Sequence, residues 1–308
     1  MSKPEASLRY RILHRTVYDY GSEVVHAHQL LYLTPRKSAH QRCLRHSLAI
    51  SPQPALRSES IDAFGNPVTR LELDRPHDRL EVDAHMEVEL MARPPAIAGD
   101  SMPWEALRNF LLYTAQPLDG VALEALQYRS ESPHVRVKAT LAEFATDCFT
   151  PGRPVLAAAE ALMHKIHAEF TYAPGVTTIT TPLMQVHEQR RGVCQDYAHF
   201  MISCVRSCGL PARYVSGYLR TEPRDLTGMT DEEQGLVGAD ASHAWVAVYA
   251  PPFGWVELDP TNDRRAGVDH VTLAWGRDFG DVSPLRGVIL GGRSHSLEVS
   301  VKVEPILP

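Results

Sequence analysis

The chain of 308 residues has a globular composition, with 44% hydrophobic and 22% charged residues and a formal net charge of −6. This length suggests about two domains and a hydrophobic core that needs no disulfide staples. The acidic balance argues against a broad nucleic-acid footprint, which requires a basic excess. The sequence holds no run of about 20 apolar residues, so we expect no membrane-spanning helix.

The N-terminus and the cysteines favour a cytoplasmic location. Residues 1–6 are polar and no apolar segment follows them, so we expect no signal peptide. The cysteines are odd in number and scattered, unlike a disulfide framework: Cys43, Cys148, Cys194, Cys204 and Cys208. Paired CxxC or CxxH motifs of a zinc site are missing from the sequence. We therefore predict no cofactor and no metal.

The first ninety residues have the pattern of β-strands. From Leu80 to Leu90, apolar residues alternate with acidic residues and a histidine, which indicates a strand with one buried face. Further candidate strands span residues 9–20, 44–50 and 68–73, the last after the turn signal of residues 64–67. These segments predict an antiparallel β domain over residues 1–95.

A Pro/Gly-rich loop over residues 91–103 marks a possible domain boundary. Short helix candidates at residues 104–113 and 137–145 follow it, so residues 96–154 are interpreted as a helical linker region. We then expect a core over residues 155–265. A C-terminal tail, residues 266–308, ends in one strand because apolar residues alternate over 297–303.

Within the predicted core, residues 155–170 carry apolar residues on one helical face. An extended stretch is expected at residues 177–181. A second helix is expected over residues 194–208, because Gly209 is a typical stop and Pro211 cannot continue a helix. Candidate strands follow at the end of the core: residues 213–219, 244–250 and 255–258.

Cys194 follows a glycine and a valine and opens the predicted helix. Free N–H groups and the dipole at a helix start stabilise a thiolate, so this position suits a nucleophile. A lone cysteine is more often a buried structural residue. Cys204 and Cys208, on the same helix, are given that structural interpretation.

His243 and Asp259 lie on two predicted strands that a short loop connects. If residues 250–254 form a five-residue hairpin loop, residue 249 pairs with 255 and residue 245 pairs with 259. His243 and Asp259 then share a face as diagonal neighbours, about 7–8 Å apart by Cα. A two-residue loop would shift the register by one residue and break this arrangement.

A cysteine, a histidine and an aspartate so placed suit acyl transfer. The imidazole takes the thiol proton and returns it to the leaving amine, while the carboxylate orients the imidazole. The backbone N–H of Cys194 is the expected oxyanion donor, and Gln195 and Tyr172 are candidates for a second donor. His199 points about 140° away from Cys194 around the helix, so packing or hydrogen bonding is its expected role.

Two histidines of the first domain and two glutamates of the core are further polar candidates. His26 and His28 could bind a metal on one strand face, but the sequence places no acidic or cysteine partner near them. Glu188 and Glu257 are interpreted as surface or support residues.

Several segments resemble the bacterial transglutaminase-like cysteine hydrolases, whose core is papain-like: residues 192–199, 209–218, 242–245 and 254–262. Residues 10–35 with 62–66 are similar to the N-terminal β domain of these proteins, and residues 276–282 to their tail. The resemblance implies an α+β fold in which a nucleophile helix packs on an antiparallel sheet. It implies Cys194 as nucleophile, His243 as base and acid, and Asp259 as the orienting residue.

The expected function is thiol-dependent hydrolysis of a peptide or amide bond through a thioester. Transfer of the acyl group to an amine uses the same residues and stays an alternative, as a transglutaminase or as an accessory in amide-bond formation. A non-catalytic binding scaffold is the other alternative. The acidic loop over residues 222–240 either rims the cleft and disfavours acidic substrates or is a solvated surface loop. The oligomeric state is left open.

Overall fold

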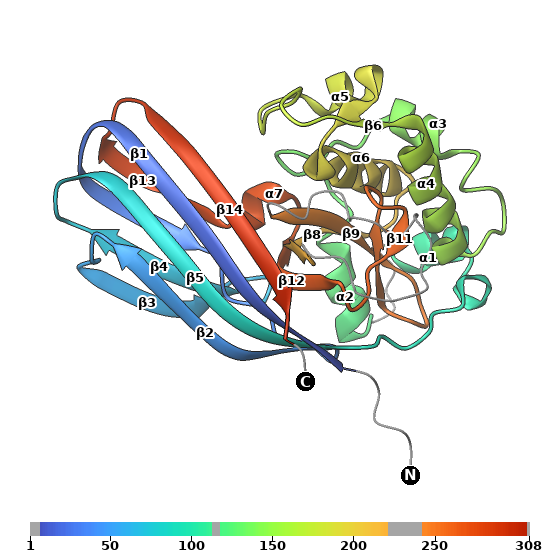
Figure 1. Cartoon of the computed structure of the whole chain (residues 1–308). Helices are drawn as coiled ribbons and strands as arrows, with labels where there is room; N and C mark the ends of the chain where they lie inside the picture. The colour runs from blue at the N-terminus through green and yellow to red at the C-terminus, as the bar shows by residue number, and fades with distance from the viewer. Residues whose placement is uncertain (1–6, 113–117, 221–241, 307–308) are drawn as a thin grey trace, which may run out of the picture.

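The computed structural model describes residues 7–112, 118–220 and 242–306. It has an α+β fold with two main sheets, as Figure 1 shows. A large twisted sheet, formed mostly by the N-terminal strands, lies to one side. The helices and the second sheet form the other side, and one continuous cluster of buried apolar residues joins the two parts. The predicted fold class is therefore confirmed.

The first sheet contains, among the described residues, seven antiparallel strands in the order β2–β5–β1–β4–β3, with β13 and β14 also paired to β1. β1 (Ser7–Leu31) is long enough to pair with four strands along its length. The others are β2 (Gln41–Ser51), β3 (Leu56–Ile61), β4 (Pro67–Leu73), β5 (His77–Met91), β13 (Leu285–Gly291) and β14 (His295–Pro305).

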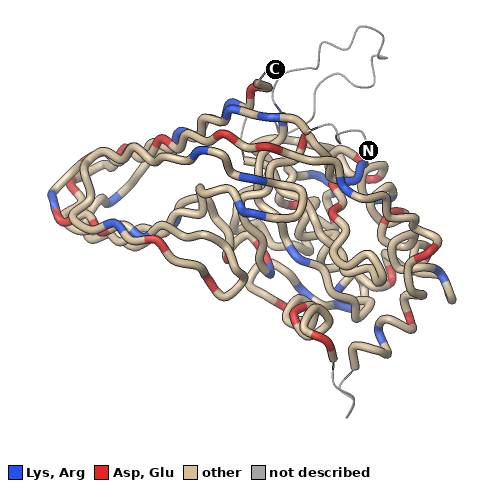
Figure 2. Tube along the Cα trace, turned by 90° about the horizontal axis from the view of Figure 1, so that it is seen from below, with Lys and Arg blue, Asp and Glu red and all other residues tan. Residues whose placement is uncertain are grey.

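The alternation that predicted β5 corresponds to burial in the structure. The apolar residues of the strand face the core and are at most 3% exposed. The acidic residues between them lie on the opposite face and pair with arginines of β1, as Glu81 does with Arg15 at 3.1 Å. Figure 2 shows basic and acidic residues interspersed along these strands. Exposed pairs of this kind contribute at most about 1 kcal/mol each.

The helical part is built around α6 (Cys194–Ser207), which is buried along most of its length. It contacts α3 (Ala139–Ala145), α4 (Val155–Glu169) and α5 (Leu183–Gln189). Gly209 ends the α6 region as predicted, with a φ of +80° that favours glycine. The remaining helices are η1 (Ala98–Asp100), α1 (Trp104–Phe110), α2 (Gly120–Leu126) and α7 (Phe279–Val282).

Two details differ from the sequence-based expectation. Residues 177–181, expected to be extended, form a turn closed by the bond from Thr181 N–H to the Thr178 carbonyl at 2.9 Å. The short helices α2 and α5 were not predicted, whereas α1 and α3, which are equally short, lie within the helix candidates at residues 104–113 and 137–145. None of the described helices has both the length and the apolar character needed to cross a membrane.

The second sheet has the strand order β11–β10–β9–β8–β12 over the part of the chain that the structure describes. α6 packs against β8 and β9 on one face of this sheet. The strands are β8 (Ala212–Leu219), β9 (His243–Tyr249), β10 (Trp255–Asp259), β11 (Arg264–Arg265) and β12 (His270–Gly276). A separate parallel pair, β6 (Thr171–Tyr172) with β7 (Arg191–Gly192), precedes α6.

The chain beyond residue 265 belongs to both sheets. The strand expected over residues 297–303 is confirmed as part of β14, which pairs with β1. β12 extends the second sheet and β13 the first, so the C-terminal residues form more than a tail with one strand. These pairings join strands far apart in the sequence, which local patterns do not reveal.

Candidate active site

Cys194 is the first residue of α6, and its side chain is nearly buried. The carboxylate of Asp196 folds back over the helix start, where Oδ2 accepts from the Val193 N–H at 2.8 Å and from Thr177 Oγ1 at 2.7 Å. A Cβ added to Gly192 would lie 2.5 Å from the same oxygen, so this position requires glycine. The fold-back fixes Cys194 at the end of the helix where N–H groups have no intrahelical acceptor.

His243 and Asp259 meet across the β9–β10 hairpin. The register predicted from a five-residue loop is confirmed, with the pairs Tyr249–Trp255 and Val246–Leu258. His243 Nε2 lies 2.9 Å from Asp259 Oδ2, and both side chains are fully buried. The hairpin therefore brings the predicted base, His243, and the predicted orienting residue, Asp259, into direct hydrogen bonding.

Cys194 also contributes to the pKa shift of the His243 imidazole. Burial alone lowers the pKa of His243, but the charges of Asp259 and Cys194 and hydrogen bonds with both outweigh it and raise the pKa to about 10. Nε2 is engaged by Asp259, and no nitrogen or oxygen of the described residues bonds to the buried Nδ1. Within the described residues, Nδ1 is thus the ring nitrogen that has no hydrogen-bond partner.

Asp259 is held by more groups than the sequence predicted. Its Oδ1 accepts the backbone N–H of Thr261 at 3.0 Å and of Asn262 at 3.2 Å. Its Oδ2 accepts Asn262 Nδ2 at 2.8 Å and His270 Nε2 at 3.1 Å. Burial raises the pKa of Asp259, but the His243 charge and the hydrogen bonds from His243 and His270 lower it overall. Asp259 is therefore a carboxylate.

His270, the first residue of β12, was missed by sequence reasoning. Its Nδ1 accepts the Gly267 N–H at 3.3 Å, so its Nε2 carries the proton and donates to Asp259. Burial lowers the pKa of His270, which keeps the ring neutral. The residues around His270 form no recognisable motif. His270 lies beside Asp259 because β12 pairs with β8, and the local sequence does not reveal that pairing.

The ring of His243 is supported by Trp245, which stacks on it at 5.9 Å between centroids. Trp245 Nε1 donates to Glu257 Oε2 at 2.7 Å, and Arg93 pairs with the same oxygen at 2.9 Å. Burial raises the pKa of Glu257, but the Arg93 charge and these hydrogen bonds lower it to about 2. Glu257 is thus a buried support residue, whereas Glu188 lies on the surface.

The other predicted residues lie around the helix start. Tyr172 of β6 lies beside Gly192, and Gln195 lines a crevice of about 470 Å³ together with residues 178–184. Their part in an oxyanion hole stays a prediction. His199 accepts the Phe279 N–H at 3.1 Å and stacks on His134, so its expected packing and hydrogen-bonding role is confirmed. Burial lowers the pKa of His199 to about 3.

The remaining predictions concern two further thiols and the acidic loop. Cys204 is fully buried, and Cys208 is partly buried at the end of α6. Burial raises the pKa of Cys204 well above its ordinary value and that of Cys208 to about 11. Both agree with a structural role. The acidic loop over residues 222–240 lies outside the described residues.

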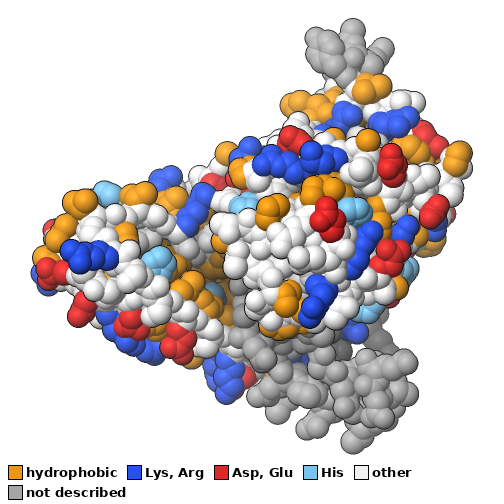
Figure 3. Space-filling model, turned by 90° about the horizontal axis from the view of Figure 1, so that it is seen from above, with side chains coloured by type: hydrophobic (Ala, Val, Ile, Leu, Met, Phe, Trp, Pro, Cys, Tyr) orange, Lys and Arg blue, Asp and Glu red, His pale blue; other side chains and the backbone are white. Residues whose placement is uncertain are grey.

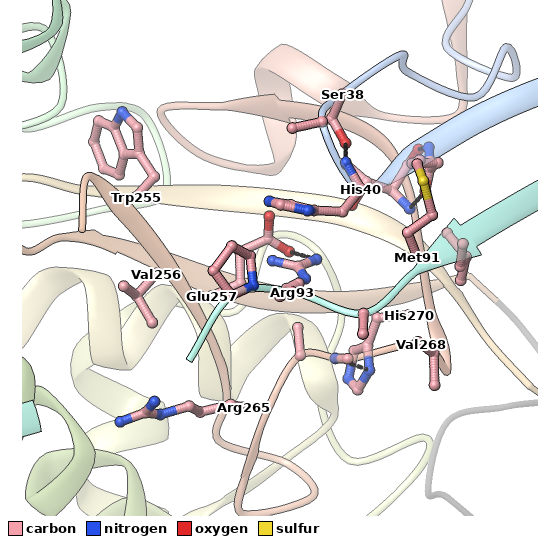
Figure 4. Close-up of a pocket in the computed structure, with 18 of the residues that line it drawn as sticks. Ser38, His40, Met91, Arg93, Trp255, Val256, Glu257, Arg265, Val268 and His270 are labelled. Carbon is pink, nitrogen blue, oxygen red and sulfur yellow. Dashed lines mark hydrogen bonds and ion pairs between the residues drawn. The ribbon is translucent and has the colours of Figure 1, made fainter. Parts of the chain in front are cut away.

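A cavity of about 700 Å³ lies where the first and second sheets meet, and His270 and Glu257 line it. Figure 4 shows Arg93 reaching Glu257 across it, with His270 on another wall. Arg36, which follows β1, lies 3.4 Å from the ring centroid of Trp275. Arg213 lies 3.7 Å from that ring and 4.3 Å from Trp255. We call Arg36, Arg213, Trp255 and Trp275 the arginine–tryptophan stack. It connects the loop after β1 of the first sheet to the second sheet, which carries His243.

A thiol at a helix start, beside an imidazole–carboxylate pair on an antiparallel sheet, defines the papain-like class of folds. Residues 10–89 match the bacterial transglutaminase-like N-terminal region, and residues 142–260 match the transglutaminase-like superfamily. The chain belongs to this superfamily.

Relatives cover nearly the whole chain. An uncharacterized protein of Mycobacterium tuberculosis is 37% identical over 305 residues, 96% of this chain and 93% of the relative. One from Mycobacterium leprae is 32% identical over 297 residues, 96% of this chain and 98% of that protein. The solved structure of a proposed cysteine protease from Cytophaga hutchinsonii aligns with 98% of this chain, and the alignment spans 91% of the solved chain, with a TM-score of 0.71. At 21% identity, that likeness shows the fold.

Proposed function

We propose that the protein is a thiol-dependent hydrolase that cleaves an amide or peptide bond through a thioester on Cys194. The observation that carries this proposal is the convergence of three separate segments. His243 Nε2 bonds to Asp259 at 2.9 Å, and the charge of Cys194 raises the pKa of the same ring. The five unpaired cysteines support a reducing, cytoplasmic location.

The arrangement supports a two-step reaction. The thiolate of Cys194 attacks the substrate carbonyl carbon, and the oxyanion that forms is directed to the N–H groups at the start of α6. The imidazolium of His243 gives its proton to the leaving amine as the C–N bond breaks, which leaves a thioester. His243 then takes a proton from water, which attacks the thioester and releases the acid and the thiolate. Asp259 stabilises the imidazolium in both steps.

Selective alkylation tests the proposal. We expect iodoacetamide to label Cys194 first at neutral pH, and His243→Ala to slow this labelling at least about tenfold. Burial raises the pKa of the other four thiols, so they should react slowly. The rate is measured against pH by mass spectrometry, with Cys194→Ala as the control. Equal labelling of all cysteines, or no effect of His243→Ala, would contradict an activated thiol.

Transfer to an amine is the second candidate. A Pseudomonas aeruginosa protein named protein-glutamine gamma-glutamyltransferase is 30% identical over 109 residues, which is 33% of this chain and 16% of that protein. Water and an amine attack the same thioester, so the products separate the two reactions. With a glutamine peptide and a primary amine present together, we expect the free acid as the main product. A main product that carries the amine would favour transfer instead.

A further inference from the structure

Two histidines of β1 lie together on the outer face of the first sheet. His26 and His28 are two residues apart, so their side chains point to the same side of the strand, while Ala27 between them is buried. Their Nε2 atoms are 2.9 Å apart. Strand β4 places Glu72 directly opposite His28, and Glu72 Oε1 lies 3.9 Å from His26 Nε2.

An acidic partner for these histidines is not expected from the sequence, but the fold brings Glu72 to them. Glu72 is remote in sequence, but β1 and β4 pair over residues 27–31 and 69–73. The pairing is anchored by the core, because Ala27 and Leu73, which face each other across the strands, are buried. The backbone that carries the three side chains is thus held by the sheet.

The distances suit coordination of one small cation. In a tetrahedral zinc site with bonds of 2.0 to 2.1 Å, neighbouring ligand atoms lie about 3.3 Å apart. The two contacts, 2.9 Å between the histidines and 3.9 Å to the carboxylate, lie on either side of that value. All three ligand atoms are within 4.8 Å of one another. Small rotations of exposed side chains bring them to a common centre.

We propose that His26, His28 and Glu72 bind one divalent transition-metal ion of the zinc type. Two imidazole nitrogens and one carboxylate oxygen suit Zn²⁺, Ni²⁺ or Cu²⁺, whereas Mg²⁺ and Ca²⁺ prefer oxygen ligands. Three protein ligands leave a fourth tetrahedral position to water. The ion would connect β1 to β4, and its three ligands lie far from Cys194 in the sequence.

Apolar residues of β13 lie beside the two histidines on the surface of the first sheet. Val288 and Leu290 of β13 pair with His28 and His26 from the other side of β1. Their side chains are 69% and 65% exposed, so apolar groups flank the histidines on the surface. Figure 3, seen from above, shows hydrophobic and histidine side chains on the surface of the lobe that the first sheet forms, interspersed with charged ones.

Calorimetry with zinc chloride tests the proposal. The full chain is used without a histidine tag, in the Cys194→Ala background, so that the active-site thiol cannot bind the ion. After removal of metals with a chelator, we expect one equivalent of Zn²⁺ to bind and Mg²⁺ to give no signal. His28→Ala and Glu72→Gln should each weaken zinc binding at least about tenfold.

His85→Ala is the matched control, since His85 is also exposed on a strand of this sheet, and it should leave the affinity unchanged. Circular dichroism checks that each variant folds, which is expected because His28 is exposed and Glu72 is partly exposed. Zinc binding that survives in both His28→Ala and Glu72→Gln would overturn the assignment, as would the absence of binding in the starting protein. A rise in Tm with Zn²⁺ that His28→Ala abolishes would support it.

Discussion

Asp259→Asn should slow thioester formation by about 100- to 10,000-fold, the range that positioned acid–base groups contribute. Asparagine keeps the shape of the side chain but removes the charge that holds His243 protonated. The Asp259 charge is the largest of the interactions that raise the pKa of His243. Without it, the burial that lowers the pKa of His243 is opposed by fewer interactions, so the pKa of the imidazole falls. Single-turnover kinetics with an activated amide, or alkylation of Cys194 where no substrate is known, measures the change.

The same substitution should change the pH dependence of stability. In the wild type, the pKa of His243 is raised to about 10, from an unfolded value of about 6.5. The protonated pair therefore stabilises the fold fully below about pH 6.5, and this contribution is lost as the pH rises toward 10. Asp259→Asn should flatten that decline in the free energy of unfolding. The exposed Asp74→Asn is the control, and an unchanged pH profile in Asp259→Asn would contradict the assignment.

Gly217→Ala should destabilise the protein by about 3 kcal/mol, the upper part of the range for overpacking. A Cβ at this position of β8 would lie 2.0 Å from the Val271 carbonyl oxygen and 2.5 Å from the Trp245 ring. One of these atoms belongs to the backbone of β12, so the sheet itself must shift. Thermal unfolding should show a fall in Tm of roughly 6 °C.

The position of Gly217 also connects stability with the site. It pairs with His243 in the sheet, and Trp245 stacks on that imidazole, so alkylation of Cys194 should slow as well. Gly99→Ala is the matched control, because an added Cβ there meets no atom within 4 Å. A Gly217→Ala protein as stable as the Gly99→Ala protein would show that the strands can separate at little cost.

The hairpin of the candidate site could be predicted from the sequence because its geometry is local. A five-residue loop over residues 250–254 was one of two loop lengths considered, and loop length sets which residues face each other. The glycine before Cys194 and the stop at Gly209 likewise marked both ends of α6. These inferences needed only neighbouring residues, and the structure reproduces them.

The rest of the site depends on contacts between distant segments. His270 reaches Asp259 because β12 crosses to pair with β8, and Arg93 reaches Glu257 from the loop after β5. Glu72 meets the histidines of β1 through strand pairing alone. Periodicity predicts which face of a strand is buried, but it does not say which strand lies beside it. The sequence therefore allowed prediction of the residues proposed to react, but not of the long-range contacts that hold them in place.

The return of the last strands to β1 has a consequence for synthesis on the ribosome. β1 emerges early, but its partners β13 and β14 follow only at residues 285–305. At 5–20 residues per second, roughly 250 further residues take on the order of 10 to 50 s. During that time one side of β1 has no strand to pair with, and such an edge attracts other chains. The nascent protein is thus expected to depend on chaperones, and a chain stopped near residue 265 should aggregate.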